Sequence, residues 1–140
     1  MEYVSHSEKQ TDQIAQNLVK ILQGGEVIAL SGDLGTGKTT FVKGVAKAFG
    51  IARDITSPTF AILKEYPVNF GRIKKMVHVD AYRLAGAKDA EAIGLPEFFD
   101  NQNAVTLIEW PENIETLLPQ RMKILKFEYI DEKTRKITIS

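Results

Sequence analysis

The stretch GDLGTGKT, residues 32–39, places the tightest limit on how this chain can fold. It fits the pattern G-x-x-x-x-G-K-[ST] in full. It also lies between VIALS (27–31), an apolar run typical of a buried strand, and a segment with helical spacing of apolar residues (38–49). Glycines in such a loop let backbone N–H groups turn inward, so the loop and the start of the next helix form an anion site. The motif therefore predicts an α/β fold built around a phosphate-binding loop.

The positions of this loop predict how a nucleoside triphosphate is held. We expect the Lys38 ammonium to lie at the β and γ phosphates and the Thr39 hydroxyl to bind Mg²⁺. Thr40 is a weaker candidate for the α phosphate. The remaining contacts are expected from the loop itself, at Gly35, Thr36 and Gly37. A glycine-rich turn that binds nothing is the alternative, but motif and context agree, which favours nucleotide binding.

Composition narrows the class of protein. The 140 residues suit one domain, spanning 1–140. Cysteine is absent, which excludes disulfides and thiolate metal sites and is compatible with a reducing cytosol, so we expect a cytoplasmic protein. No apolar run approaches ~18 residues and the N-terminus lacks a signal-peptide layout, so we expect no membrane contact. Lys plus Arg equals Asp plus Glu, at 18 each, whereas dedicated nucleic-acid binders usually carry a basic excess.

The order of apolar patterns predicts an α/β sandwich of the P-loop NTPase type, with a mixed, partly antiparallel central sheet and flanking helices. Helices are expected at 7–23, 38–49, 89–93, 96–99 and 111–118. Strands are expected at 27–31, 59–66, 73–79, 105–110, 122–130 and 135–139. The polar stretch PVNFGR (67–72) is read as a hairpin connection, and the last two strands are expected to turn at residues 131–133.

Two carboxylates stand at the ends of predicted strands. Asp80 ends KMVHVD and Glu109 ends VTLIE. A P-loop needs an acidic partner that holds Mg²⁺ or orients the attacking water, and in open α/β sheets such a group lies at the carboxyl end of a neighbouring strand. The spacing does not decide which of the two contacts the metal. Trp110, the single tryptophan, follows Glu109 directly; packing is the commoner role for an indole.

Two further motifs leave alternatives open. TSPT (56–59) occupies the region where P-loop switch proteins carry a hydroxyl that senses the γ phosphate, but an ordinary Ser-Pro turn is as good a reading. In HVDAYRL (78–84), His78 and Asp80 share one face of a strand because side chains alternate. A lone His at a strand end is more often structural than catalytic. Arg83 suits either charge stabilisation or a structural ion pair.

Five motifs together resemble a known family. GDLGTGKTTF, SPTF, HVDAYRL, GLPEFF and IEWPE occur in the same order as in the bacterial TsaE family, also called YjeE, and the resemblance covers nearly the whole chain. It implies a P-loop ATPase that supports synthesis of N6-threonylcarbamoyladenosine (t6A) on tRNA. It also implies that the protein acts with TsaD and TsaB, with ATP hydrolysis resetting that complex and tRNA contacted only indirectly or weakly.

The resemblance also implies roles for particular residues. Thr39 and Glu109 become the Mg²⁺ ligands, and Asp80 becomes the candidate for metal support or water activation. Thr59 becomes the switch-like hydroxyl. The N-terminal segment is expected to contact the nucleotide near Glu8 and Thr11.

Other P-loop classes fit less well. A small-molecule kinase needs an acceptor pocket and an arginine-bearing lid, for which 140 residues leave little room. A regulatory GTPase carries D-x-x-G and N-K-x-D, and neither occurs here, so adenine is the better guess. The third alternative is an ATP-binding assembly switch with negligible turnover.

Overall fold

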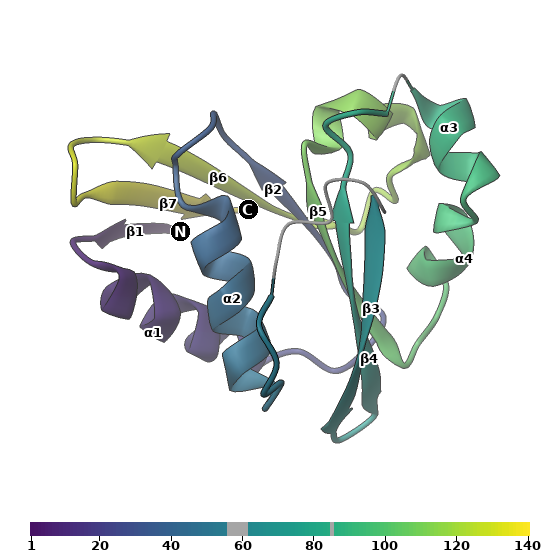
Figure 1. Cartoon of the computed structure of the whole chain (residues 1–140), viewed down its shortest axis with the longest axis horizontal. Helices are drawn as coiled ribbons and strands as arrows, with labels where there is room; N and C mark the ends of the chain where they lie inside the picture. Colours follow the sequence, from purple (N-terminus) through teal and green to yellow (C-terminus); the bar gives the residue numbers. More distant parts are fainter. Residues whose placement is uncertain (56–61, 85) are drawn as a thin grey trace.

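The sheet runs through the whole molecule and carries helices on both faces (Figure 1). The computed structural model describes residues 1–55, 62–84 and 86–140. Its strands are β1 (Glu2–Ser5), β2 (Val27–Ser31), β3 (Leu63–Phe70), β4 (Ile73–Asp80), β5 (Ala104–Glu109), β6 (Lys123–Tyr129) and β7 (Arg135–Ile139). Its helices are α1 (Glu8–Val19), α2 (Lys38–Ala48), α3 (Ala87–Ala92) and α4 (Leu95–Phe99), with a 3₁₀ segment, η1, at Pro111–Leu117.

Strand order confirms the predicted mixed sheet. The order is β1-β7-β6-β2-β5-β4-β3. The β6-β2, β2-β5 and β5-β4 pairs are parallel, whereas β1-β7, β6-β7 and β3-β4 are antiparallel. The carboxyl ends of β2, β5 and β4 therefore lie side by side at one edge of the sheet, which is where ligands bind in open α/β sheets.

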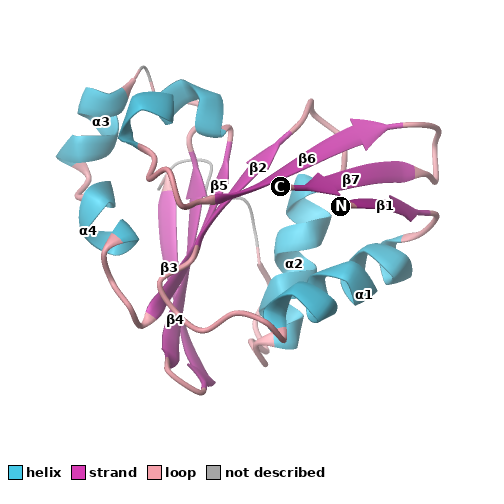
Figure 2. Ribbon diagram, turned by 180° about the vertical axis from the view of Figure 1, so that it is seen from behind, coloured by secondary structure: helices cyan, strands magenta, loops and turns pink. Residues whose placement is uncertain are grey.

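Helices cover both faces of this sheet, which Figure 2 shows from behind. An apolar core lies on each face. Side chains of α1 and α2 pack on one face, against residues such as Leu30 and Leu107. Side chains of α3, α4 and η1 pack on the other, against residues such as Val77 and Ile108. Alternation along β5 thus sends Leu107 and Glu109 to the α2 face and Ile108 to the opposite face.

The hairpin of β3 and β4 differs from the expected one. Residues 67–70 continue β3 instead of forming a connection, and the chain turns at Gly71 and Arg72. Pro67 is tolerated because β3 is an edge strand, where a missing N–H leaves no partner unpaired. The register shifts between Pro67 and Phe70. The first residues of the predicted strand, 59–61, lie outside the described residues.

The other differences concern one missed strand, the type of one helix and the end of β5. The sequence missed β1, a four-residue edge strand paired to β7, because so short a run carries little periodicity. The predicted helix at 111–118 is a 3₁₀ segment with non-helical angles at Ile114. Trp110 is not the last residue of β5 because its φ of 60° breaks the extended backbone.

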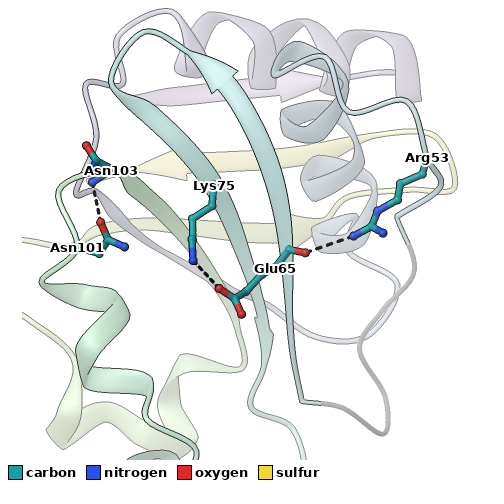
Figure 3. Close-up of polar contacts among 5 residues, drawn as sticks. All are labelled: Arg53, Glu65, Lys75, Asn101 and Asn103. Atoms are coloured by element: carbon teal, nitrogen blue, oxygen red, sulfur yellow. Dashed lines mark hydrogen bonds and ion pairs between the residues drawn. The ribbon is translucent and has the colours of Figure 1, made fainter.

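Polar contacts link β3 to β4 and to the chain after α2, and another lies in the turn before β5 (Figure 3). Lys75 Nζ lies 2.7 Å from Glu65 Oε1, and Arg53 Nη2 donates to the Glu65 carbonyl oxygen at 3.3 Å. Asn103 N donates to Asn101 Oδ1 at 2.9 Å in the turn before β5. The Lys75–Glu65 pair is exposed, so it contributes at most about 1 kcal/mol.

No helix in the described part of the chain is long and apolar enough to cross a membrane.

Candidate functional site

A cavity of about 870 Å³ opens at the sheet edge where β2, β5 and β4 end. It collects side chains from segments far apart in the sequence: the β1–α1 connection, the P-loop, the ends of β4 and β5, and the β6–β7 turn. Nine of the predicted site residues line it: Glu8, Thr11, Gly35, Gly37, Lys38, Thr39, Thr40, Asp80 and Glu109. The structure thus brings the two predicted acids and the phosphate loop to one place.

The P-loop leaves β2 and enters α2 along the path that the motif predicts. Gly32 has φ of 147°, and a Cβ there would lie 2.6 Å from the Phe127 carbonyl oxygen. Gly37 precedes α2 with φ of 100°, in the left-handed region. At Gly32, a side chain would collide with the Phe127 backbone. At Gly37, a side chain would be strained by the left-handed backbone, so both positions require glycine.

Among the predicted residues of the P-loop, Thr36 is the one that does not line the cavity. The Thr36 hydroxyl donates to the Asp33 carbonyl oxygen at 2.6 Å, and its side chain is buried. Any contact of Thr36 with phosphate is therefore expected from its backbone N–H. Thr59 lies outside the described residues, so its switch role stays a prediction.

Lys38 is held by its own loop and by an aromatic ring. Its Nζ donates to the Gly32 carbonyl oxygen at 2.5 Å and lies 3.6 Å from the centre of the Trp110 ring. Burial lowers the pKa of Lys38 from 10.5, and nearby carboxylates oppose this in part: Glu109, Glu112, Asp80 and Asp33. The cavity therefore holds a desolvated ammonium whose charge interacts strongly with an anion.

Glu109 is buried at the end of β5 and has a partner on each oxygen. Its Oε2 lies 2.6 Å from His78 Nε2, and its Oε1 accepts from the Thr39 hydroxyl at 3.3 Å. Asp80 pairs with Glu109 in the register of β4 and β5, and its Oδ1 accepts from Tyr82 N at 3.0 Å. Glu109 is thus the acid that contacts the P-loop threonine, whereas Asp80 lies beside it.

These residues fit an Mg²⁺ ion that is bound together with phosphate. Within the described residues, no group of three or more His, Cys, Asp and Glu side chains gathers to hold a metal. Mg²⁺ typically takes one or two carboxylates plus substrate phosphates and water, so a threonine hydroxyl and one carboxylate oxygen are a suitable protein contribution. The donors that fit are Thr39 and Glu109.

Sequence reasoning missed the walls of the cavity. The additional lining residues are Ser5, His6, Ser7, Leu34, Trp110, Glu132, Lys133 and Arg135. Two of these are cations on the β6–β7 side, and Arg135 Nε donates to the Gly35 carbonyl oxygen at 3.3 Å. No local signal identifies them, because the pairing of β1 with β7 and of β6 with β2 brings them to the P-loop. Trp110 was singled out, but its contact with Lys38 was not predicted.

The β6–β7 turn is ordered by Asp131. Its Oδ1 accepts from Lys133 N at 3.0 Å and from Thr134 N at 2.9 Å. Hydrogen bonds from Thr134 and the Lys133 backbone lower the pKa of this exposed carboxyl. The predicted turn at 131–133 is confirmed, and its geometry positions Lys133 and Arg135 beside the phosphate loop.

Comparison with known proteins agrees with this geometry. The family model described as "Threonylcarbamoyl adenosine biosynthesis protein TsaE" matches residues 5–137. A relative named tRNA threonylcarbamoyladenosine biosynthesis protein TsaE, from Bacillus subtilis, is 40% identical over 132 residues, covering 94% of this chain and 80% of the relative. A relative of the same name from Aquifex aeolicus is 36% identical over 140 residues, covering 99% and 94%.

A solved structure shows the same fold. The crystal structure of Bacillus subtilis YdiB aligns with a TM-score of 0.81 at 34% identity, covering 99% of this chain and 83% of that one. The residues matched by the family model, 5–137, include every residue that lines the cavity. By sequence and by structure, the chain belongs to the TsaE family.

Proposed function

We propose that this protein is a Mg²⁺-dependent ATPase that acts in t6A biosynthesis on tRNA. The observation that carries the proposal is the cavity in which Lys38, Thr39 and Glu109 converge at the carboxyl edge of the sheet. The names of its relatives support the t6A assignment. The absence of the guanine motif N-K-x-D supports ATP over GTP.

The residues of the cavity suggest how each contributes. The Lys38 ammonium binds the β and γ phosphates, which requires it to leave the Gly32 carbonyl oxygen. The Thr39 hydroxyl and Glu109 Oε1, which lie 3.3 Å apart, are assigned to Mg²⁺, which would neutralise charge on the phosphates when bound. Asp80 lies beside Glu109 and is assigned to metal support or to orienting water.

The nucleotide is proposed to extend from the P-loop toward α1. Glu8 and Thr11 line that wall, and Thr11 Oγ1 lies 2.7 Å from Ser5 Oγ, which fixes the hydroxyl pair at the start of α1. Thr40 faces the same cavity from α2. Gly35 and Gly37 supply backbone to the phosphates. We also propose that residues 1–140 form one domain, since the seven strands in the described part of the chain join one sheet.

TsaD and TsaB are the proposed partners. The chain has 18 basic and 18 acidic residues, and this balanced charge suits protein partners better than direct binding of tRNA.

Phosphate release from ATP and GTP, measured with the protein alone and with TsaD–TsaB added, tests the proposed function. ATP-specific release that rises with the partners is the expected result. GTP preference would contradict it, phosphoryl transfer to a metabolite would indicate a kinase, and tight binding without turnover would indicate an assembly switch.

A further inference from the structure

His78 is buried next to the candidate site, but it does not line the cavity in which the nucleotide is proposed to bind. It lies on β4, two residues before Asp80, and its side chain has no exposed surface. β4 and β5 are parallel neighbours (Figure 1), with His78 paired to Leu107 and Asp80 paired to Glu109. His78 therefore approaches Glu109 from behind, on the side away from the end of the strand.

The contact uses one specific oxygen of Glu109. His78 Nε2 lies 2.6 Å from Glu109 Oε2, and both side chains are buried. A carboxylate can only accept, so Nε2 donates. Among the described residues, His78 Nδ1 has no hydrogen-bond partner, so Glu109 is the polar contact that this ring makes. A short bond to a charged acceptor fixes both the rotamer and the plane of the carboxylate.

The second carboxylate oxygen of Glu109, Oε1, lies on the side of the cavity. Glu109 Oε1 is the atom that accepts from the Thr39 hydroxyl at 3.3 Å. With Oε2 hydrogen-bonded to His78, Oε1 is the oxygen that Glu109 presents to a cation in the cavity, and a cation that also took Oε2 would compete with the His78 contact. The geometry therefore favours ligation through a single oxygen.

We propose that His78 is a positioning residue that restricts Glu109 to one-oxygen ligation and thereby makes the site selective for Mg²⁺ over Ca²⁺. Mg²⁺ requires near-octahedral geometry at 2.0–2.1 Å, whereas Ca²⁺ accepts six to eight oxygens and readily takes a carboxylate through both. Groups that orient a metal-binding carboxylate typically contribute about 10–100-fold to metal affinity. This inference rests on the proposed function, because it assigns Glu109 to the metal.

A purely structural role for the pair predicts something different. A buried hydrogen-bonded pair that only supports the fold changes stability when broken, and it does not change the preference between two cations. Metal selectivity therefore separates the two roles, whereas loss of activity or stability does not.

Three variants of His78 provide the comparison. His78→Gln keeps an amide N–H near the position of Nε2, His78→Asn has an amide that stops short of Oε2, and His78→Leu removes the donor. Thr106→Val is the matched control, since Thr106 is a buried polar residue on β5 whose side chain lies on the opposite face from Glu109. Thermal unfolding of each variant shows which are folded.

The measurement is calorimetric titration of a non-hydrolysable ATP analogue without metal, with Mg²⁺ and with Ca²⁺. In His78→Asn and His78→Leu, we expect the Mg²⁺-dependent gain in analogue affinity to fall about 10-fold or more. We also expect the affinity ratio of Mg²⁺ to Ca²⁺ to move toward Ca²⁺, with the metal-free affinity unchanged. His78→Gln and Thr106→Val should stay within about 3-fold of the wild type, and His78→Asn alone suffices if His78→Leu does not fold.

An unchanged ratio of Mg²⁺ to Ca²⁺ in folded His78→Asn overturns the inference while leaving the proposed function in place. Equal losses in His78→Gln and His78→Asn also overturn it, since they indicate a need for the ring and not for the donor. Failure of the wild type to bind the analogue with Mg²⁺ overturns the proposed function together with the inference.

Discussion

Trp110 combines a strained backbone with a contact to the P-loop lysine. Its φ and ψ are 60° and 50°, which costs a bulky residue about 1–3 kcal/mol. The turn is held because Asn113 Nδ2 donates to the carbonyl oxygens of Ala81 and Tyr82, which ties the chain after β5 to the chain after β4. The indole is thereby placed against Lys38 and 5.1 Å from the Tyr82 ring. Trp110 thus lines the cavity as well as taking part in the packing.

This contact predicts a fluorescence response. Trp110 is the only tryptophan, and ATP should draw the Lys38 ammonium from its ring toward the phosphates. We expect a saturable change in tryptophan emission when ATP is titrated. Lys38→Ala should alter the emission of the free protein and abolish the response. An unaltered response in Lys38→Ala would show that Lys38 is not its source.

The lowered pKa of Lys38 predicts a pH dependence of nucleotide affinity. Phosphates bind the protonated amine, and burial makes this amine lose its proton below pH 10.5. Affinity for ATP should therefore fall as the pH rises through the lowered pKa of Lys38. Titrations from pH 7 to pH 10 measure this. Lys38→Arg stays charged throughout, so any ATP affinity it retains should not show the fall.

The positions of the candidate site residues were predictable where they depend on a local pattern. Lys38 and Thr39 are fixed by the spacing of the P-loop, and Asp80 and Glu109 by their places at strand ends. The spacing did not decide between the two acids. The structure favours Glu109, because only the register of β2, β4 and β5 places its Oε1 beside the Thr39 hydroxyl. The left-handed turn at Trp110 depends on the same tertiary path and leaves no sequence signal.

At the level of elements, α1 and α2 pack closely because of one small residue. A Cβ on Gly44 would lie 2.9 Å from the Ala15 Cβ and 2.9 Å from Asp12 Oδ1. In Gly44→Ala, the gain of about 1 kcal/mol in helix propensity should be outweighed by overpacking that costs about 1–3 kcal/mol. We expect a lower midpoint of thermal unfolding. Lys43→Ala, one residue earlier on the exposed side, should change the stability by less than about 0.5 kcal/mol.

β5 contains a buried hydroxyl without a partner. Thr106 Oγ1 makes no hydrogen bond among the described residues, and the side chain has no exposed surface. Thr106→Val replaces the hydroxyl by a methyl group of similar size, so we expect stability to rise by about 1 kcal/mol. Denaturant unfolding measures the change. A loss of stability would show that the hydroxyl is satisfied in solution, for example by buried water.

The elements with a marked apolar pattern of their own were the most predictable. The bounds of β2 and β7 match the prediction, and α2 ends one residue earlier than expected. β1 and the outer half of β3 were not recognised, because edge strands are stabilised by pairing with a neighbour and need no apolar pattern of their own. The missing β1 explains why the wall at Ser5–Ser7 was also missed.

At the scale of the whole molecule, the sheet order is what creates the site. β2 lies between β5 and β6, so the P-loop meets Glu109 on one side and the β6–β7 turn on the other. Five separate segments therefore surround one cavity, and substitutions in any of them should affect nucleotide binding. The sequence predicted the mixed sheet but not this order, since strand pairing between distant segments is set by tertiary packing.

The central claim is that this cavity binds Mg²⁺·ATP through Lys38, Thr39 and Glu109. A crystal structure with Mg²⁺ and a non-hydrolysable ATP analogue tests it most directly. We expect the β and γ phosphates at Lys38 Nζ, with the metal bound by Thr39 Oγ1 and Glu109 Oε1 and with the His78 contact to Oε2 retained. Metal bound directly by Asp80 in place of Glu109, or nucleotide bound outside this cavity, would contradict it.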